Sequence, residues 1–296
     1  MAIKLDLDIR LSNINLALCT ARNIQLRLLR LDQIHPAVSG NKWFKLHKYI
    51  EMVQEGRYAG IITFGGAYSN HLVATAAACS YHNIPCTGFV RGLEGSDHPT
   101  ESLQECRQWH MELQFLSRAA YARKNDPEFL LQLQAQYPAH LIIPEGGYGI
   151  PGIAGAGDIY AYIPEDTDLI ALPVGSGTTI IGIINRLQDQ QQAMGFAAIR
   201  QGDYLKETIR QHCNRTNWQL ETEYHFGGFG KHKPELLNFI RNFRQQQGIT
   251  LDFVYTAKMM YGLLESIEKY QWQDKKIVAL HTGGLQGNSS IQHLLP

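Results

Sequence analysis

Short aliphatic segments, each followed by glycine or serine and then by a helical pattern, recur along the whole chain. In the first half they are GIITF (60–64), PCTGFV (85–90), ELQFL (112–116) and HLIIP (140–144). In the second half they are DLIALPV (168–174), FAAI (196–199) and KIVALHT (276–282). Strands that alternate with helices in this way build parallel sheets from βαβ units. We therefore expect an α/β protein with a parallel sheet in each half.

Helices of the second half are predicted from their apolar spacing. The segment PELLNFIRNFRQQQG (234–248) carries apolar residues at helical intervals and closes on glycine. The segment 259–270 likewise places three aliphatic residues on one face. Between the two predicted sheets, residues 145–158 include six glycines among 14 residues. So much glycine weakens regular structure and allows close backbone approach, so we place a domain crossover near it.

Charge and hydropathy argue against several classes of protein. The chain has 27 basic and 27 acidic residues, a formal net charge of +0, so we expect no nucleic-acid partner. No segment approaches the roughly 18 apolar residues of a membrane span, so we expect no membrane association. The five cysteines form no CxxC pair that would indicate zinc or redox chemistry. We expect no metal site and a reducing, cytoplasmic environment.

The segment SGNKWFKL (39–46) contains a lysine that needs an explanation. Bulky Trp43, Phe44 and Leu46 predict that this segment is buried. Burial makes the ammonium of Lys42 costly unless that group is paired, neutralised or used covalently. Lys42 is therefore a candidate reactive amine.

A glycine loop follows the strand DLIALPV, before an apolar helix. Its residues are Gly175, Ser176, Gly177, Thr178 and Thr179. Small residues let backbone amides converge at a helix N-terminus, where the dipole favours a phosphate, and the hydroxyls add donors. The loop lacks the lysine of a Walker A motif, which argues against a nucleoside triphosphate. An ordinary strand-to-helix turn would have the same appearance.

A third motif, GGAYSNH, places Ser69, Asn70 and His71 where a helix is predicted to begin. A helix N-cap would explain either Ser69 or Asn70. The triplet nevertheless offers more donors than a cap requires, and it could hold the carboxylate of an amino acid. His71 alone, without clustered ligands, does not make a metal site.

Two further motifs lie near the C-terminus. In HTGG, Thr282 follows an aliphatic strand at the edge where open parallel sheets bind ligands, although a plain turn and a hydrogen-bonded core His281 would explain the same residues. In LDFVYTAKMM, Tyr255 and Thr256 mark the passage into a helix, and Thr256 is a candidate cap or hydroxyl donor. We expect Lys258 to be solvated.

These motifs combine into one kind of site. A reactive lysine, a phosphate-binding glycine turn and a carboxylate-binding Ser-Asn turn are the groups needed to hold pyridoxal 5'-phosphate as a Schiff base. The same groups would present an amino-acid substrate to it.

The five motifs, in this order, resemble the 1-aminocyclopropane-1-carboxylate deaminase/D-cysteine desulfhydrase family of tryptophan synthase β-like pyridoxal phosphate enzymes. The matches run from about residue 39 to residue 287. The resemblance implies two open parallel-sheet domains with helices on both faces. Residues 1–46 and 152–296 would form the larger, cofactor-binding domain, and residues 47–151 the smaller one. Related folds pair, so we expect a homodimer by analogy.

The resemblance also implies roles for individual residues. Lys42 would bind the cofactor covalently and carry the α-proton of the substrate, with Ser69 and Tyr255 as the other catalytic residues. Asn70 would bond the phenolic oxygen of the cofactor, and Lys45 would lie near the cofactor. The residues that would hold the phosphate are Gly175, Ser176, Gly177, Thr178 and Thr179. The residues that would contact the substrate are Ser69, Asn70, His71, Tyr255, Thr282 and Gly283.

Two positions separate the branches of the family. Deaminases carry Glu after the tyrosine and Leu inside the His-x-Gly-Gly motif, where this chain has Thr256 and Thr282. A carboxylate beside the pyridine nitrogen makes the ring a deep electron sink, and a hydroxyl supports the pyridinium less. Eliminating a β-thiolate needs little accumulated carbanion. The resemblance therefore predicts a lyase that converts D-cysteine, or a related β-substituted D-amino acid, to pyruvate, ammonia and sulfide.

Other functions stay open. One is 1-aminocyclopropane-1-carboxylate deaminase, and another is a different β-eliminase or dehydratase acting on D-amino acids. A pyridoxal phosphate carrier without turnover is a third. An unrelated nucleotide-binding module is a fourth, supported by the glycine turns alone. Phe44 stands where the family commonly has arginine, so any polar role of that side chain is lost.

Overall fold

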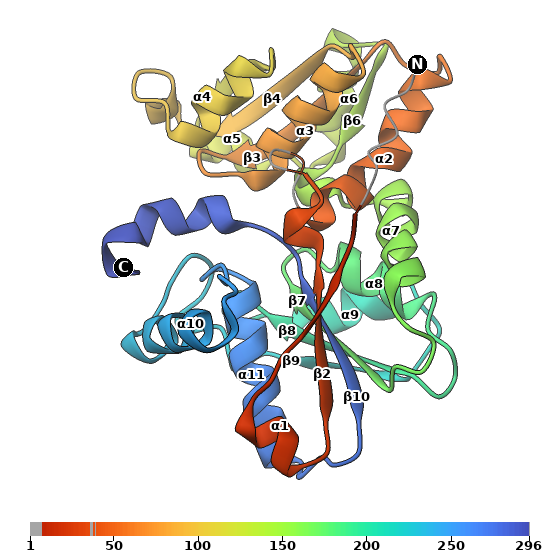
Figure 1. Cartoon of the computed structure of the whole chain (residues 1–296). Coiled ribbons are helices and arrows are strands. Elements are labelled where there is room, and N and C mark those ends of the chain that lie inside the picture. The colour runs from red at the N-terminus through yellow and green to blue at the C-terminus, as the bar shows by residue number, and fades with distance from the viewer. Residues whose placement is uncertain (1–7, 36–37, 39, 296) are drawn as a thin grey trace. The chain divides into compact units, whose positions relative to one another are not determined.

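A computed structural model describes residues 8–35, 38 and 40–295 of the chain. These residues form two compact units, each with its own sheet (Figure 1). The first unit contains Lys42–Gly155 together with His35 and Val38. The second contains residues 8–34, Gly40, Asn41 and the residues that follow Gly155.

The first unit is built on a four-stranded sheet of order β5-β4-β3-β6, in which every neighbouring pair is parallel. Its strands are β3 (Gly60–Gly66), β4 (Cys86–Arg91), β5 (Glu112–Leu116) and β6 (His140–Ile143). All four strands predicted in this half of the chain are confirmed.

Helices pack on both faces of this sheet. One face carries α2 (Asn41–Gln54), α3 (Asn70–Tyr81) and α4 (Glu101–Gln108), and the other carries α5 (Arg118–Ala122) and α6 (Pro127–Gln136). The adjacent β3 residues Ile61 and Ile62 belong to these two different cores, as the period of two in a strand requires. The helix α7 (Ile150–Gly157) ends the unit.

The second unit has a six-stranded sheet of order β1-β2-β10-β7-β8-β9. Its strands are β1 (Leu11–Asn13), β2 (Gln25–Arg30), β7 (Leu169–Val174), β8 (Gln192–Ala197), β9 (Trp218–Glu221) and β10 (Lys276–His281). Strand β1 is antiparallel to β2, whereas the other neighbours are parallel. The prediction of a strand at 196–199 was wrong in its bounds, because Gly195 interrupts the apolar run from which it was predicted.

Helices also cover both faces of this second sheet. Their bounds are α1 (Ala17–Ala21), α8 (Thr178–Ile184), α9 (Tyr204–Arg210), α10 (Pro234–Gln247) and α11 (Thr256–Lys269). A Cβ on Gly195 of β8 would lie 2.5 Å from Ile180 of α8, and a Cβ on Gly262 of α11 would lie 2.7 Å from Phe196. Because adjacent residues of a strand point to opposite faces, α8 and α11 lie on opposite sides of the sheet. The predicted helix at 234–248 is confirmed, with Gly248 as its left-handed cap.

Within these residues, no helix has the length and apolar character needed to cross a membrane.

Candidate active site

In the second unit, the Gly-Asn pair that precedes Lys42 lies against the turn after β10. Gly40 has a φ of +69°, and a Cβ at this position would lie 1.9 Å from the carbonyl oxygen of Thr282. The backbone N–H of Asn41 donates to the same oxygen at 3.3 Å. Glycine is required here because no side chain fits between the two segments. Gly40 and Asn41 therefore meet the turn of the HTGG motif, which is far from them in the sequence.

The side chain of Asn41 links this junction to the glycine loop. Its amide Nδ2 donates to the Thr179 hydroxyl at 2.8 Å, and both residues are buried. Within the loop, the hydroxyl oxygens of Ser176 and Thr178 lie 2.9 Å apart, and Gly177 adopts a φ of +85° before α8. Asn41, which holds the Thr179 hydroxyl, is also the first residue of α2.

Tyr255 lies against the first glycine of the loop. A Cβ on Gly175 would lie 3.1 Å from the hydroxyl oxygen of Tyr255. The backbone N–H groups of Tyr255 and Thr256 donate to the buried Asp252 carboxylate at 2.7 and 2.9 Å. Sequence reasoning missed Asp252, although an aspartate just before a predicted helix is a recognisable capping signal. Asp252 fixes the backbone of both candidate residues.

The hydroxyl of Thr256 is buried and has no hydrogen-bond partner among the described residues. A buried polar atom normally has a partner, and a missing one indicates that something else binds there. Lys258, two residues later, corrects the prediction of a solvated side chain. It is only 2% exposed, and its ammonium donates to the carbonyl oxygen of Gly228 at 2.8 Å.

His281 is a hydrogen-bonded core histidine, one of the two interpretations that the sequence left open. Its Nε2 lies 2.9 Å from the carbonyl oxygen of Thr250, and its Nδ1 accepts from the Gly283 N–H at 3.3 Å. The Nδ1 atom also lies 3.7 Å from the carboxylate of Asp32. The imidazole thus shapes the turn on which Thr282 sits, and the Gly283 N–H is used inside that turn.

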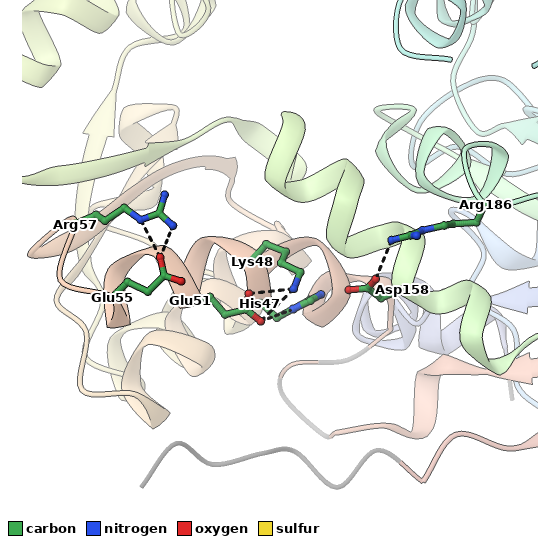
Figure 2. A network of polar contacts seen from close by, with 7 residues as sticks. All are labelled: His47, Lys48, Glu51, Glu55, Arg57, Asp158 and Arg186. Atoms are coloured by element: carbon green, nitrogen blue, oxygen red, sulfur yellow. Dashed lines mark hydrogen bonds and ion pairs between the residues drawn. The ribbon is translucent and has the colours of Figure 1, made fainter. Parts of the chain in front are cut away.

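In the first unit, helix α2 carries two kinds of lysine. Lys45 is buried, and burial together with the charge of Lys42 lowers the pKa of Lys45 well below its usual value. Lys48, which is more accessible, pairs with Glu51 at 3.0 Å, and His47 lies 3.3 Å from the same carboxylate (Figure 2). In the described part of the chain no carboxylate pairs with Lys45.

His71 lies close enough to Lys42 and Lys45 for their charges to affect its pKa. The Thr63 hydroxyl donates to the carbonyl oxygen of Ile143 at 2.9 Å, so its oxygen accepts from His71 Nε2 at 2.8 Å. The other ring nitrogen, Nδ1, then carries a lone pair, and it is buried without a partner among the described residues. Burial and the charges of Lys42 and Lys45 lower the pKa of His71 to about 3. His71 is therefore a neutral imidazole at physiological pH.

Gly147, a glycine of the segment 145–158, packs against Lys45 and His71. Gly147 has a φ of +73°, and a Cβ there would lie 3.0 Å from Cβ of Lys45 and 3.7 Å from the ring of His71. The close backbone approach predicted for this segment is thus directed at the two basic side chains.

The residues of the SNH triplet have different roles: Ser69 caps a helix, whereas the Asn70 amide is not used by the described residues. Ser69 is the N-cap of α3, and its hydroxyl accepts from the Leu72 N–H at 3.3 Å. The cap interpretation of Ser69 is therefore confirmed. Asn70 begins the helix, and its half-buried side-chain amide makes no hydrogen bond with the residues that the structure describes.

Most of the predicted site residues, together with Asn41, fall into two groups, one in each unit, and Ser69, Asn70 and Gly283 lie outside both. The basic cluster consists of Lys42, Lys45 and His71, and the loop cluster consists of Asn41, Gly175, Ser176, Gly177, Thr178, Thr179, Tyr255, Thr256 and Thr282. The first offers amines and a neutral imidazole, and the second offers hydroxyls and backbone amides. Over the described ranges no group of His, Cys, Asp and Glu residues could hold a metal ion.

Comparison with known proteins adds independent information. The family model described as "Pyridoxal-phosphate dependent enzyme" matches residues 17–283. The chain is 27% identical over 270 residues to the "Putative 1-aminocyclopropane-1-carboxylate deaminase" of Pyrococcus horikoshii, covering 84% of this chain and 81% of that protein. It is 28% identical over 296 residues to the "Bifunctional D-cysteine desulfhydrase/1-aminocyclopropane-1-carboxylate deaminase, mitochondrial" of Arabidopsis thaliana, covering 89% and 73%.

One solved structure, a crystal structure of an "ACC deaminase homologue", matches with a TM-score of 0.82 at 23% sequence identity. The match covers 98% of this chain and 94% of that one. The predicted fold, a tryptophan synthase β-like α/β architecture, is confirmed.

Proposed function

Because the chain belongs to the pyridoxal-phosphate dependent enzyme family, as its motifs predicted, we propose that it is a carbon-sulfur lyase. Its substrate is D-cysteine or a related β-substituted D-amino acid. D-Cysteine and one water give pyruvate, ammonia and hydrogen sulfide. Pyridoxal 5'-phosphate supplies an aldehyde that condenses with amines and a ring that withdraws electrons from the α-carbon.

The residues present fit this cofactor. The unpartnered, buried hydroxyl of Thr256 suits the ring nitrogen, which needs a hydrogen-bonding group. The glycine loop from Gly175 to Thr179 offers backbone amides and hydroxyls to a phosphate. The free amide of Asn70 would donate to the phenolic oxygen.

Lys42 would attach the cofactor and then move the proton at the substrate α-carbon. Both tasks require an amine that is neutral for part of the cycle. Burial and the charge of Lys42 lower the pKa of both Lys45 and His71, so this cluster disfavours more than one positive charge. Ser69, His71 and Tyr255 would orient the substrate carboxylate and side chain, together with Thr282.

The observation that carries the choice of reaction is the buried hydroxyl at Thr256. A neutral hydroxyl cannot hold a proton on the ring nitrogen as a carboxylate does, so it supports elimination of a good leaving group better than opening of a cyclopropane. The similarity to the Arabidopsis bifunctional protein supports D-cysteine as the substrate.

The test is a parallel product assay on the purified, cofactor-loaded protein. D-Cysteine and β-chloro-D-alanine should release pyruvate, and L-cysteine is the matched stereochemical control. Release of 2-oxobutyrate from 1-aminocyclopropane-1-carboxylate, with no pyruvate from the D-amino acids, would refute the lyase. It would favour a deaminase, the activity named for the Pyrococcus relative.

A second test locates the reactive amine. Borohydride reduction followed by peptide mass spectrometry should find the cofactor on Lys42. The Lys42→Ala variant should lose both the label and turnover, whereas Lys48→Ala, an accessible lysine of the same helix, should keep both. A label on Lys45 would reassign the covalent role.

The setting of the enzyme is part of the proposal. We propose that residues 1–46 and 152–296 make up the cofactor-binding domain and residues 47–151 the smaller one, boundaries a few residues from the limits of the compact unit at Lys42 and Gly155. We also propose that the enzyme acts in the cytoplasm as a homodimer. Pairing among related folds supports the dimer. Light scattering should give twice the 33.4 kDa of one chain, and a value near 33.4 kDa would refute it.

A further inference from the structure

The turn formed by residues 226–230, FGGFG, has a strained backbone. The φ angle is positive at Phe226 (+52°), Gly227 (+98°), Gly228 (+117°) and Gly230 (+62°). A phenylalanine in the left-handed region is unusual, and such a conformation persists only where the surrounding structure holds it. Contacts with the surrounding residues must therefore hold this turn in its conformation.

The buried ammonium of Lys258 is one such anchor. Its Nζ donates to the carbonyl oxygens of Gly228 at 2.8 Å and Ala198 at 3.4 Å. The Ala198 N–H donates in turn to Val174, the last residue before the glycine loop. Lys258 thus ties helix α11, the end of β8 and the turn together at one point.

The charge of Lys258 makes this arrangement costly. Burial lowers the pKa of Lys258 to about 8, and the negative charge of Asp252 opposes that shift. No carboxylate forms an ion pair with this ammonium among the described residues. A buried charge that is held by carbonyl oxygens alone needs a reason to be there.

The turn that this charge holds carries two phenylalanines, and each of them packs against a tyrosine. Phe226 is buried and packs edge-on against Tyr261, with ring centroids 5.1 Å apart. Phe229 is 61% exposed and packs edge-on against Tyr255, with centroids 5.9 Å apart. The ring of Tyr255 therefore contacts the turn as well as Gly175 of the glycine loop.

We propose that Lys258 is a positioning residue for the candidate site. Its ammonium holds the strained turn 226–230, and the turn holds the ring of Tyr255 beside the loop cluster. Lys258 touches neither substrate nor cofactor in this account, and it acts through Phe229. The inference rests on the proposed function only for its substrate measurements.

The first experiment needs no activity. Hydrogen exchange of the cofactor-free protein is followed by mass spectrometry in Lys258→Met and in Lys269→Met, an exposed lysine of the same helix. The Gly228 and Lys231 N–H groups are hydrogen-bonded inside the turn. They should exchange about tenfold faster or more in Lys258→Met and at the wild-type rate in Lys269→Met. Exchange within about twofold of wild type in Lys258→Met would overturn the proposal.

The second experiment separates positioning from folding. With D-cysteine, Lys258→Met and Phe229→Ala should each raise KM about tenfold with a smaller change in kcat, and the double variant should match the single ones. Additive effects would show that Lys258 acts by another route and would overturn the proposal. Should the Met variant fail to fold, Lys258→Gln takes its place, because its shorter, uncharged side chain keeps N–H donors but not the reach or charge of the lysine, and the same direction of effects is expected. A wild-type protein without turnover would refute the proposed function, while the exchange experiment would still decide the role of Lys258.

Discussion

Lowering the pH from 7 to 5 should destabilise the folded protein by about 2 kcal/mol through His71 alone. The imidazole is buried and donates to Thr63, and the nearby lysines disfavour its protonation, so its pKa falls from 6.5 to about 3. In the unfolded chain the same group takes up a proton below about pH 6.5. Between the two values the unfolded state binds more protons, so stability is lost as the pH falls.

The magnitude follows from the two pKa values. At pH 5 the unfolded chain gains RT ln[(1 + 10^1.5)/(1 + 10^−2)], about 2.1 kcal/mol, from protonation of His71, whereas at pH 7 it gains about 0.2 kcal/mol. The complete loss of stability for a pKa that falls from 6.5 to about 3 is about 5 kcal/mol, and it is reached only below pH 3.

The assay is urea unfolding at pH 7 and pH 5 of the wild type, His71→Gln and His98→Gln. Glutamine keeps an N–H donor at position 71 but does not titrate, so this variant should lose about 2 kcal/mol less than the wild type between the two pH values. His98 is exposed, and its variant should follow the wild type. Equal pH dependence in all three proteins would refute the burial of a neutral His71.

Two further substitutions test the loop cluster. Asp252→Ala removes the acceptor of two buried N–H groups, at Tyr255 and Thr256, and should cost about 2–4 kcal/mol in urea unfolding; a loss under about 0.5 kcal/mol would contradict the capping role. Gly40→Ala places a methyl group 1.9 Å from the Thr282 carbonyl oxygen, so the two segments must move apart. Titration of the apoprotein with pyridoxal 5'-phosphate should then show an affinity reduced about tenfold or more, the loss expected when the residues that support a site move. Its matched control is Gly56→Ala, which has a φ of +78° and no atom within 4 Å of the new methyl group; this variant should cost only about 1–2 kcal/mol of stability and leave the affinity unchanged.

The strands that the sequence predicted are those in which an aliphatic run ends at glycine or a turn. Three were missed, and their sequences explain why. Strand β2, QLRLLR, alternates leucine with two arginines, and β9, WQLE, has four residues. Strand β1 has three residues and is extended because it pairs with β2. Such segments become strands through the neighbours that they pair with, which a single sequence does not display.

The glycines of the site were easier to predict than its charges. Gly147 stands in the segment 145–158, whose glycine content already predicted close backbone approach, whereas the contact of Gly40 with Thr282 was not predicted. The burial of Lys258 could not be read in the same way, because the carbonyl groups that hold it are 30 and 60 residues distant in sequence. The neutral state of His71 likewise depends on burial and on two lysines that only the fold brings near.

The prediction that SGNKWFKL is buried holds for Phe44, Lys45 and Leu46, whereas Lys42 and Trp43 are half-buried. A buried ammonium is costly, and a second positive charge close to it raises that cost. Burial and the charge of Lys42 favour the neutral forms of Lys45 and His71, and no carboxylate pairs with Lys45 among the described residues. A carboxylate beside Lys42 would stabilise its ammonium and so remove the nucleophile. A buried Lys45 without an acidic partner among the described residues thus keeps a low pKa, which suits the amine chemistry proposed for its neighbour Lys42.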